Sequence, residues 1–139
     1  MGVVLDTSVI IEAERGAFAI EALLGSMPDE PVGVSAITAS ELLHGCYRAK
    51  DAATRSRRFA FVEALLELVP VLDFGLVEAR RHAELWAGLA RKGTAVGAHD
   101  MMIGATALAR GYALATLNGK DFRRIPGLRL IAVEPYTRQ

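Results

Sequence analysis

Short apolar runs alternate along the chain with longer stretches in which apolar residues recur at helical spacing. The apolar runs are found at residues 3–5, 32–34, 71–72, 113–115 and 130–133. A continuous apolar run is typical of a strand that is buried on both faces of a sheet. Because longer helical stretches separate these runs, we predict an α/β sandwich built around a parallel sheet.

Helical spacing predicts helices over about residues 8–24, 38–48, 52–68, 76–91 and 98–110, with the first interrupted near Gly16. In the stretch 76–91, one face carries Leu76, Ala79, Ala83, Trp86 and Ala90, and we interpret Trp86 as part of the core or of a dimer surface. The stretch 98–110 is apolar nearly all round, which indicates a central buried helix that Gly111 ends. No repeat or linker divides residues 1–139, so we interpret them as a single domain.

The composition is that of a globular chain, with 52% hydrophobic and 23% charged residues. No apolar run approaches the roughly 18–20 residues that a membrane span needs, and no secretory signal is visible. The single cysteine, Cys46, cannot form an internal disulfide, so we predict a reducing, cytoplasmic location. The apolar excess, with a mean hydropathy of +0.27, suggests a surface that is covered by self-association.

The net charge is zero, from sixteen basic and sixteen acidic residues. Proteins that bind nucleic acids usually carry a basic excess, because contacts to phosphates supply much of their affinity. A site made of clustered carboxylates would use some of the acidic residues, however, and leave the remaining surface basic. The net charge therefore leaves a nucleic-acid partner open.

Four acidic residues stand where an acid is unexpected. Asp6 directly follows the first predicted strand, Glu41 lies in the first turns of a helix, Asp100 opens the most apolar helix, and Asp121 follows the fourth strand. Two carboxylates about 4 Å apart repel by roughly 4 kcal/mol at an effective dielectric near 20, so such a cluster requires a cation. Hard oxygen ligands suit Mg²⁺ or Mn²⁺, which can activate water for phosphodiester hydrolysis.

Each acid also has a structural interpretation. The sequence from Thr38 to Glu41 matches a capping box, with Thr38 at the N-cap and Glu41 three residues later. Asp6 and Asp121 are suitable helix caps, and Asp100 suits the positive end of a helix dipole. Taken singly, each acid fits the structural interpretation better than the catalytic one, so the surrounding sequence decides.

Those surroundings resemble the four motifs of PIN-domain nucleases. Residues 3–8 (VVLDTS) are similar to the opening strand-and-aspartate motif, and residues 35–42 (SAITASEL) to the second motif, which carries a glutamate. Residues 99–108 (HDMMIGATAL) resemble the third motif and residues 115–122 (ATLNGKDF) the fourth. Their order and spacing resemble those of the toxin ribonucleases of bacterial VapBC toxin–antitoxin pairs over most of the chain.

The resemblance implies a PIN-like three-layer α/β/α sandwich around a short, mostly parallel sheet. It also implies a Mg²⁺-dependent endoribonuclease, with Mn²⁺ as a possible substitute, that acts as the toxin of a type II toxin–antitoxin system. Structured RNA, such as tRNA or rRNA, is the expected substrate. A cognate VapB-like antitoxin and a second copy of the chain, as a homodimer, are the expected protein partners.

Carried over residue by residue, the resemblance assigns Asp6, Glu41 and Asp100 to the acidic positions of the family. The fourth position is open, because relatives place an acid either where Asn118 or where Asp121 stands here. We assign the fourth ligand role to Asp121. In this interpretation Asp6 and Asp100 bind the principal ion directly, and Glu41 holds and helps to deprotonate the attacking water.

Three neighbouring polar residues are expected to support these acids. Ser8 and Thr116 would hydrogen-bond the carboxylates or the waters of the metal, and Asn118 would orient a carboxylate or a water. In an open α/β sheet, sites form beyond the carboxyl ends of the strands, where Asp6 and residues 116–118 are expected to lie.

Three other classes of protein remain as alternatives. A haloacid-dehalogenase-like phosphatase also begins with a strand and an aspartate, but it needs a second acid at the position of Ser8. A receiver domain needs paired acids after the first strand and a central phosphoacceptor aspartate, and neither is evident. A catalytically silent α/β interaction module would keep the fold without the chemistry, and the presence of all four acids argues against it.

Overall fold

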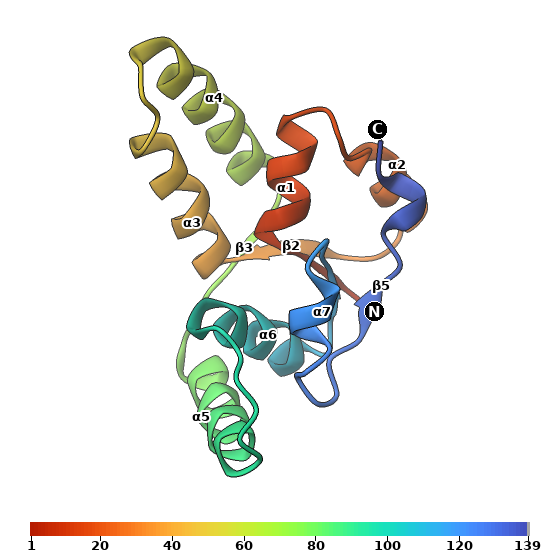
Figure 1. Cartoon of the computed structure of the whole chain (residues 1–139). Helices are drawn as coiled ribbons and strands as arrows, with labels where there is room; N and C mark the ends of the chain where they lie inside the picture. Colours follow the sequence, from red (N-terminus) through yellow and green to blue (C-terminus); the bar gives the residue numbers. More distant parts are fainter. Residues whose placement is uncertain (139) are drawn as a thin grey trace.

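The five predicted apolar runs form one sheet in the computed structural model, which describes residues 1–138 (Figure 1). The strands are β1 (Val3–Leu5), β2 (Val32–Ser35), β3 (Val71–Leu72), β4 (Ala113–Ala115) and β5 (Leu130–Ile131). Their order in the sheet is β3-β2-β1-β4-β5, and every pairing between neighbouring strands is parallel. The chain winds outward from β1 to β3 and then returns to β4, so the strand order reverses between β1 and β4. This is the place where an open α/β sheet forms a crevice.

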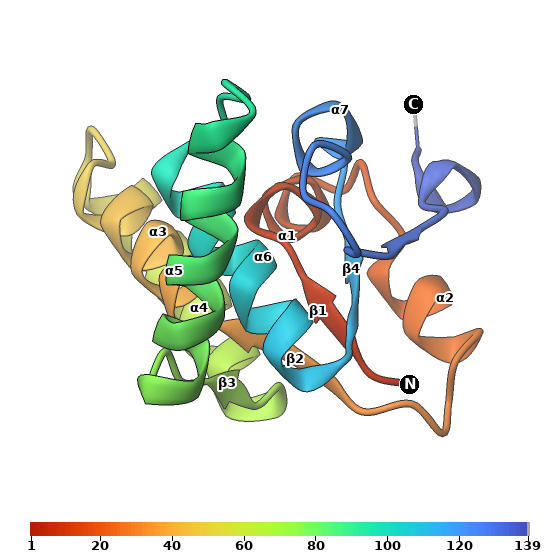
Figure 2. The same ribbon diagram turned by 90° about the horizontal axis from the view of Figure 1, so that it is seen from below.

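Helices connect the strands and cover both faces of the sheet (Figure 2). They are α1 (Thr7–Glu14), α2 (Ile20–Gly25), α3 (Ala36–Tyr47), α4 (Ala52–Leu68), α5 (Leu76–Arg91), α6 (Ala98–Arg110) and α7 (Gly119–Phe122), followed by a short 3₁₀ helix, η1 (Glu134–Tyr136). The predicted α/β/α sandwich is therefore confirmed. Among residues 1–138, no helix has both the length and the apolar character needed to cross a bilayer.

Side chains alternate across β1, and this alternation creates two cores. Val3 and Leu5 pack with Val9 of α1 in one cluster, whereas Val4 packs with Leu89 of α5 and Ile103 of α6 in the other. All three β1 side chains are essentially inaccessible to solvent. Burial on both faces explains why the strand reads as a continuous apolar run.

The predicted central helix is confirmed as α6. It has the largest share of buried residues of any helix, and Gly111 ends it in the left-handed conformation with φ 67°. Gly104 lies where the segment after α7 crosses the helix, because a Cβ there would stand 2.6 Å from Ile125. This close contact holds the α7 segment, which carries Asp121, against the helix that carries Asp100.

The predicted capping box at Thr38 is wrong. Helix α3 begins at Ala36, and the hydroxyl of Ser35 accepts the bond from the Thr38 backbone N–H at 3.0 Å. Thr38 is fully buried inside the helix rather than at its start. Glu41 is consequently one turn further into the helix than a capping residue, and its carboxylate is available for other contacts.

The interpretation of Trp86 as a core residue is also wrong, because α5 buries a different face. Leu85 and Leu89 face α6 and the sheet, whereas Trp86 and Leu76 are 59% and 67% exposed. An apolar stripe therefore remains on the outer side of α5. The other interpretation, in which Trp86 lies on a dimer surface, stays a prediction.

Candidate active site

The candidate site lies at the carboxyl ends of β1 and β4, where the strand order reverses. Asp6 follows β1, and its backbone N–H donates to the carbonyl of Ala115 in β4 at 2.9 Å. Thr116 follows β4, and both Asp6 and Thr116 are 4% exposed. The sheet register thus fixes an acid and a hydroxyl side by side.

The carboxylate of Asp6 is held by one of its two oxygens. Oδ2 accepts hydrogen bonds from the hydroxyls of Ser8 at 2.8 Å and Thr116 at 2.7 Å. These hydroxyls accept in turn from the backbone N–H groups of Leu117 and Asn118, both at 2.9 Å. The two hydroxyls therefore contact the acid as the sequence predicts. Because each hydroxyl is itself held by a backbone N–H, together they fix the orientation of the Asp6 carboxylate.

The second oxygen of Asp6 is available to a ligand. Within residues 1–138, Oδ1 has no hydrogen-bond partner, yet it is not counted among buried atoms left unsatisfied, so it reaches solvent. Asp6 stands at the N-cap position of α1 but makes no side-chain cap bond. Its interpretation as a helix cap is therefore not supported.

Glu41 reaches the site from α3 and is held at both oxygens. Oε1 accepts from the hydroxyl of Thr7 at 2.6 Å, and Oε2 lies 3.1 Å from Nδ1 of His99. Thr7 also donates to Thr38 at 3.0 Å, which ties α1 to α3 at this point. These roles of Thr7 and His99 were not predicted. The sequence contains one indication of these roles, namely that Thr7 directly follows Asp6 and His99 directly precedes Asp100.

The two remaining acids are Asp100 in α6 and Asp121 in α7. The pKa of Asp100 responds to the charges of the other three acids. Burial and the negative charges of Asp6, Asp121 and Glu41 together raise this pKa to about 6, while His99 opposes the shift. Charges act on one another in this way only at short range. Asp6, Glu41 and Asp121 therefore lie within electrostatic range of Asp100.

Asn118 differs from the prediction in how it contributes. It stands at the N-cap of α7 without a side-chain cap bond, and its described contact to the site is made by its backbone N–H, which donates to Thr116. Asp121 lies in the first turn of α7 and acts electrostatically on Asp100. Asp121 as the fourth acidic position stays a prediction, which its charge effect on Asp100 supports.

The arrangement fits a hard divalent cation that completes the site. Among residues 1–138, no three His, Cys, Asp or Glu side chains are close enough to form a ready-made cage. The carboxylates are nevertheless near enough to raise the pKa of Asp100, as expected for like charges without a counter-ion. The donors are mostly carboxylate oxygens, with Asp6 Oδ1 unoccupied by any protein donor, and such donors suit Mg²⁺ or Mn²⁺ better than Zn²⁺.

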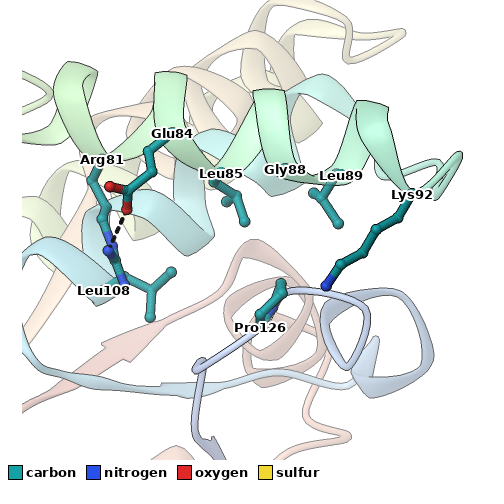
Figure 3. Close-up of a pocket in the computed structure, with 8 residues that line it drawn as sticks. All are labelled: Arg81, Glu84, Leu85, Gly88, Leu89, Lys92, Leu108 and Pro126. Carbon is teal, nitrogen blue, oxygen red and sulfur yellow. Dashed lines mark hydrogen bonds and ion pairs between the residues drawn. The ribbon is translucent and has the colours of Figure 1, made fainter.

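A separate cavity of about 170 Å³ lies between α5, α6 and the segment after α7 (Figure 3). It contains the ion pair between Arg81 and Glu84, at 2.7 Å, together with Leu85 and Leu89. None of the four acids lines it. This cavity is therefore not part of the candidate active site.

Comparison with known proteins agrees with this geometry. The model of the PIN domain family matches residues 3–128. The chain is 38% identical over 133 residues to "Ribonuclease VapC" from Rickettsia bellii, covering 96% of this chain and 97% of the relative. It is 39% identical over 97 residues to "tRNA(fMet)-specific endonuclease VapC" from Salmonella typhimurium, covering 70% and 71% respectively.

Solved structures give the same result. A chain in the crystal structure of DNA-bound VapBC from Salmonella typhimurium superposes with a TM-score of 0.85 at 32% identity, covering 94% of this chain and 97% of that one. Ribonucleases with a PIN domain generally depend on a divalent metal. The phosphatase, receiver and silent-module alternatives are not favoured. The chain belongs to the PIN-domain family, in its VapC ribonuclease branch.

Proposed function

We propose that the protein is a Mg²⁺-dependent endoribonuclease that acts as the toxin of a type II toxin–antitoxin system and hydrolyses structured RNA, such as tRNA or rRNA. The single observation that carries the proposal is that three acids act electrostatically on the partly buried Asp100, one of them being Asp6, whose Oδ1 has no protein donor among residues 1–138. The similarity to VapC ribonucleases, one of them named as specific for tRNA(fMet), supports the substrate class.

In this mechanism Asp6 and Asp100 would hold the ion, and Asp121 would be the supporting ligand. The ion, when bound, lowers the pKa of the attacking water and offsets charge on the phosphate. Glu41, fixed by Thr7 at Oε1, accepts the proton of the water at Oε2, beside His99. The oxygen of the water forms a bond to phosphorus as the bond to the leaving oxygen breaks. No side chain serves as the nucleophile, so no covalent intermediate forms.

A fluorogenic RNA cleavage assay tests the proposal. We expect cleavage with Mg²⁺ or Mn²⁺, loss of cleavage with EDTA, and recovery when the metal is restored in excess. A folded protein that cleaves RNA equally well in EDTA would contradict the metal-dependent mechanism. A folded protein that cleaves no RNA under any of these conditions would contradict the enzymatic assignment.

Replacement of Thr116 by valine tests whether the hydroxyl positions Asp6. The valine keeps the shape of the side chain but removes the donor to Oδ2 and the acceptor for the Asn118 backbone N–H. We expect cleavage to fall about 10- to 100-fold, with weaker Mn²⁺ binding, as is typical for the loss of a residue that orients a metal ligand. Thr116→Ser keeps the hydroxyl and should restore most of the activity. Equal losses in both variants would contradict a role for the hydroxyl.

The antitoxin is expected to bind beside the acids, in a groove of about 320 Å³ between α1, α3 and α4, which we call the α3–α4 groove. It begins at Glu41 and has an apolar floor that includes Leu42 and Val62. A segment lying in it would cover one side of the candidate active site. The structures of VapBC complexes that resemble this chain support such a partner.

Gly45 offers a test that spares the core. It lines the α3–α4 groove, and a Cβ at this position would meet no atom within 4 Å. We expect Gly45→Leu to fold normally, because leucine also favours a helix by up to about 1 kcal/mol over glycine. RNA cleavage should persist, while inhibition by the co-expressed antitoxin weakens at least about tenfold. Gly45→Ala, which adds a single methyl group, is the matched control, and undiminished inhibition of the leucine variant would place the antitoxin elsewhere.

A homodimer remains a prediction, and α5 supplies the candidate surface. Leu76 and Trp86 on its outer side are 67% and 59% exposed. A second copy covering this stripe would account for the apolar excess of the chain. Sedimentation of a Trp86→Glu variant, compared with the unaltered protein, checks this surface.

A further inference from the structure

A broad groove opens on the side of the acids away from the α3–α4 groove. It lies between α7 and the edge strand β5, and we call it the α7–β5 groove. Its volume is about 740 Å³, within the roughly 300–1,000 Å³ typical of ligand clefts. Thr116 and Leu117 line its inner end, and the hydroxyl of Thr116 donates to Asp6. The groove therefore adjoins the candidate active site through Thr116.

Two cations of α7 line this groove. Lys120 and Arg123 are both exposed, and within the described chain neither forms an ion pair with a carboxylate. Arg123 donates from Nε to the carbonyl of Gly119 at 3.2 Å, and its terminal nitrogens have no acceptor among residues 1–138. The hydrogen bond at Nε thus fixes the guanidinium, while its two terminal nitrogens remain available to a ligand. A pair of such N–H donors matches the geometry of a phosphate group.

Gly119 lies directly beside the guanidinium of Arg123. A Cβ on Gly119 would lie 3.4 Å from a terminal nitrogen of the guanidinium. The opposite wall is largely apolar and includes Leu128, Leu130 and Ile131, while Glu134 is the acidic side chain among the lining residues. A basic wall facing an apolar one suits a strand that has charged phosphates on one side and sugars and bases on the other.

The α3–α4 groove is a weaker candidate for nucleic acid, because two of its three cations are already engaged and, among residues 1–138, the side chain of Arg48 alone is without a partner. Arg58 donates to the carbonyl of Gly45 at 3.1 Å, and Arg15 pairs with Glu12 at 3.0 Å. That groove is also less than half as large. Its acidic residues, Glu14 and Glu41, further disfavour a phosphate chain.

We propose that the RNA strand on one side of the cleaved phosphate lies in the α7–β5 groove, where Lys120 and Arg123 bind its backbone phosphates. This inference rests on the proposed ribonuclease function and names the path of its substrate. Both residues act on binding and not on the chemical step. Their loss should therefore raise KM and leave kcat largely unchanged.

The test measures binding separately from cleavage. An Asp100→Asn background in EDTA prevents hydrolysis, and fluorescence anisotropy of a labelled single-stranded RNA is measured across a range of NaCl concentrations. We expect Lys120→Gln with Arg123→Gln to weaken binding at least about tenfold. The slope of log affinity against log salt should flatten by roughly 1.4, since each phosphate contact on a single strand contributes about 0.7. Arg57→Gln with Arg80→Gln is the matched control, because it removes the same charge outside the groove and should leave the slope nearly unchanged.

The possible results distinguish failure of the proposed RNA path from failure of the proposed ribonuclease function. An unchanged slope in the groove variant, or an equal change in the control, would overturn the RNA path. Intact RNA binding with lost antitoxin binding would assign the groove to the antitoxin and would also overturn it. The ribonuclease proposal is judged independently, by metal-dependent cleavage in the chain that retains Asp100.

Discussion

Replacing Asp100 by asparagine is expected to reduce RNA cleavage about a thousandfold while making the metal-free protein more stable. Asparagine has nearly the same shape but carries no charge, so the site loses a metal ligand that is worth several kcal/mol in the transition state. The metal-free protein gains because the carboxylate of Asp100 is partly buried near three other acids, and burial together with their charges raises its pKa to about 6. The expected gain at pH 7 is about 1–2 kcal/mol, after allowance for partial exposure to solvent.

Because the pKa of Asp100 is raised on folding, the stability of the metal-free protein depends on pH. The pKa of Asp100 is about 6 in the folded chain against 3.8 for the ordinary group, so between these values the folded state binds more protons than the unfolded state. Stability of the metal-free protein therefore falls as the pH rises from about 4 to about 6. Urea unfolding in EDTA at several pH values should show this loss in the unaltered chain and a smaller loss in Asp100→Asn. A variant that is less stable than the parent at pH 7 would contradict the account.

Replacing Glu78 by alanine is expected to lower the free energy of unfolding by about 3 kcal/mol. Glu78 is 7% exposed, and it joins the start of α5 to the end of α6. Oε1 accepts from the Gly75 backbone N–H at 2.8 Å, and Oε2 accepts from Arg110 at 2.7 Å. Burial alone would raise the pKa of this carboxyl, but the contacts with Gly75 and Arg110 outweigh burial and lower it. Its removal leaves the partly buried guanidinium of Arg110 without a carboxylate partner, with the Asp73 carbonyl at 3.4 Å as its remaining acceptor among residues 1–138.

Glu84 provides the matched control on the same helix. It forms an ion pair with Arg81 at the same distance of 2.7 Å, but its side chain is 72% exposed. Surface pairs of this kind contribute at most about 1 kcal/mol. Denaturant unfolding should therefore separate Glu78→Ala from Glu84→Ala by at least about 2 kcal/mol. RNA cleavage by the two folded variants should be similar, and equal unfolding energies would contradict the role assigned to Glu78.

The sheet and the buried helix could be predicted because elements that are buried on all sides consist almost entirely of apolar residues. A strand covered on both faces must be apolar throughout, as β1 is, and α6 is apolar all round for the same reason. The buried face of α5 could not be predicted in this way. Both Leu85 with Leu89 and Leu76 with Trp86 recur at helical spacing, and only the position of α6 decides which pair is buried.

The start of α3 was ambiguous for a similar reason. Ser35 and Thr38 are both suitable N-cap residues, and Glu41 follows Thr38 at the spacing of a capping box. The choice depends on where β2 ends, and the strand runs up to Ser35 itself. A tertiary constraint on the strand therefore overrides a plausible local motif.

The candidate site could be predicted as a set of acids but not as a geometry. The residues around Asp6, Glu41, Asp100 and Asp121 carried the resemblance to PIN-domain nucleases, and in the structure the other three acids lie within electrostatic range of Asp100. Neither the bond from Thr7 to Glu41 nor the exposed Oδ1 of Asp6 follows from spacing. Both depend on how α1, α3 and the β1–β4 pair approach one another in space.

The central claim is that a divalent ion binds among these carboxylates. A crystal soaked in Mn²⁺ and measured near the manganese absorption edge tests it most directly. The account predicts one strong anomalous peak in contact with Oδ1 of Asp6 and the carboxylate of Asp100, and no peak there in an Asp100→Asn crystal treated identically. An ion bound elsewhere, or an empty site with Asp6 and Asp100 turned apart, would contradict it.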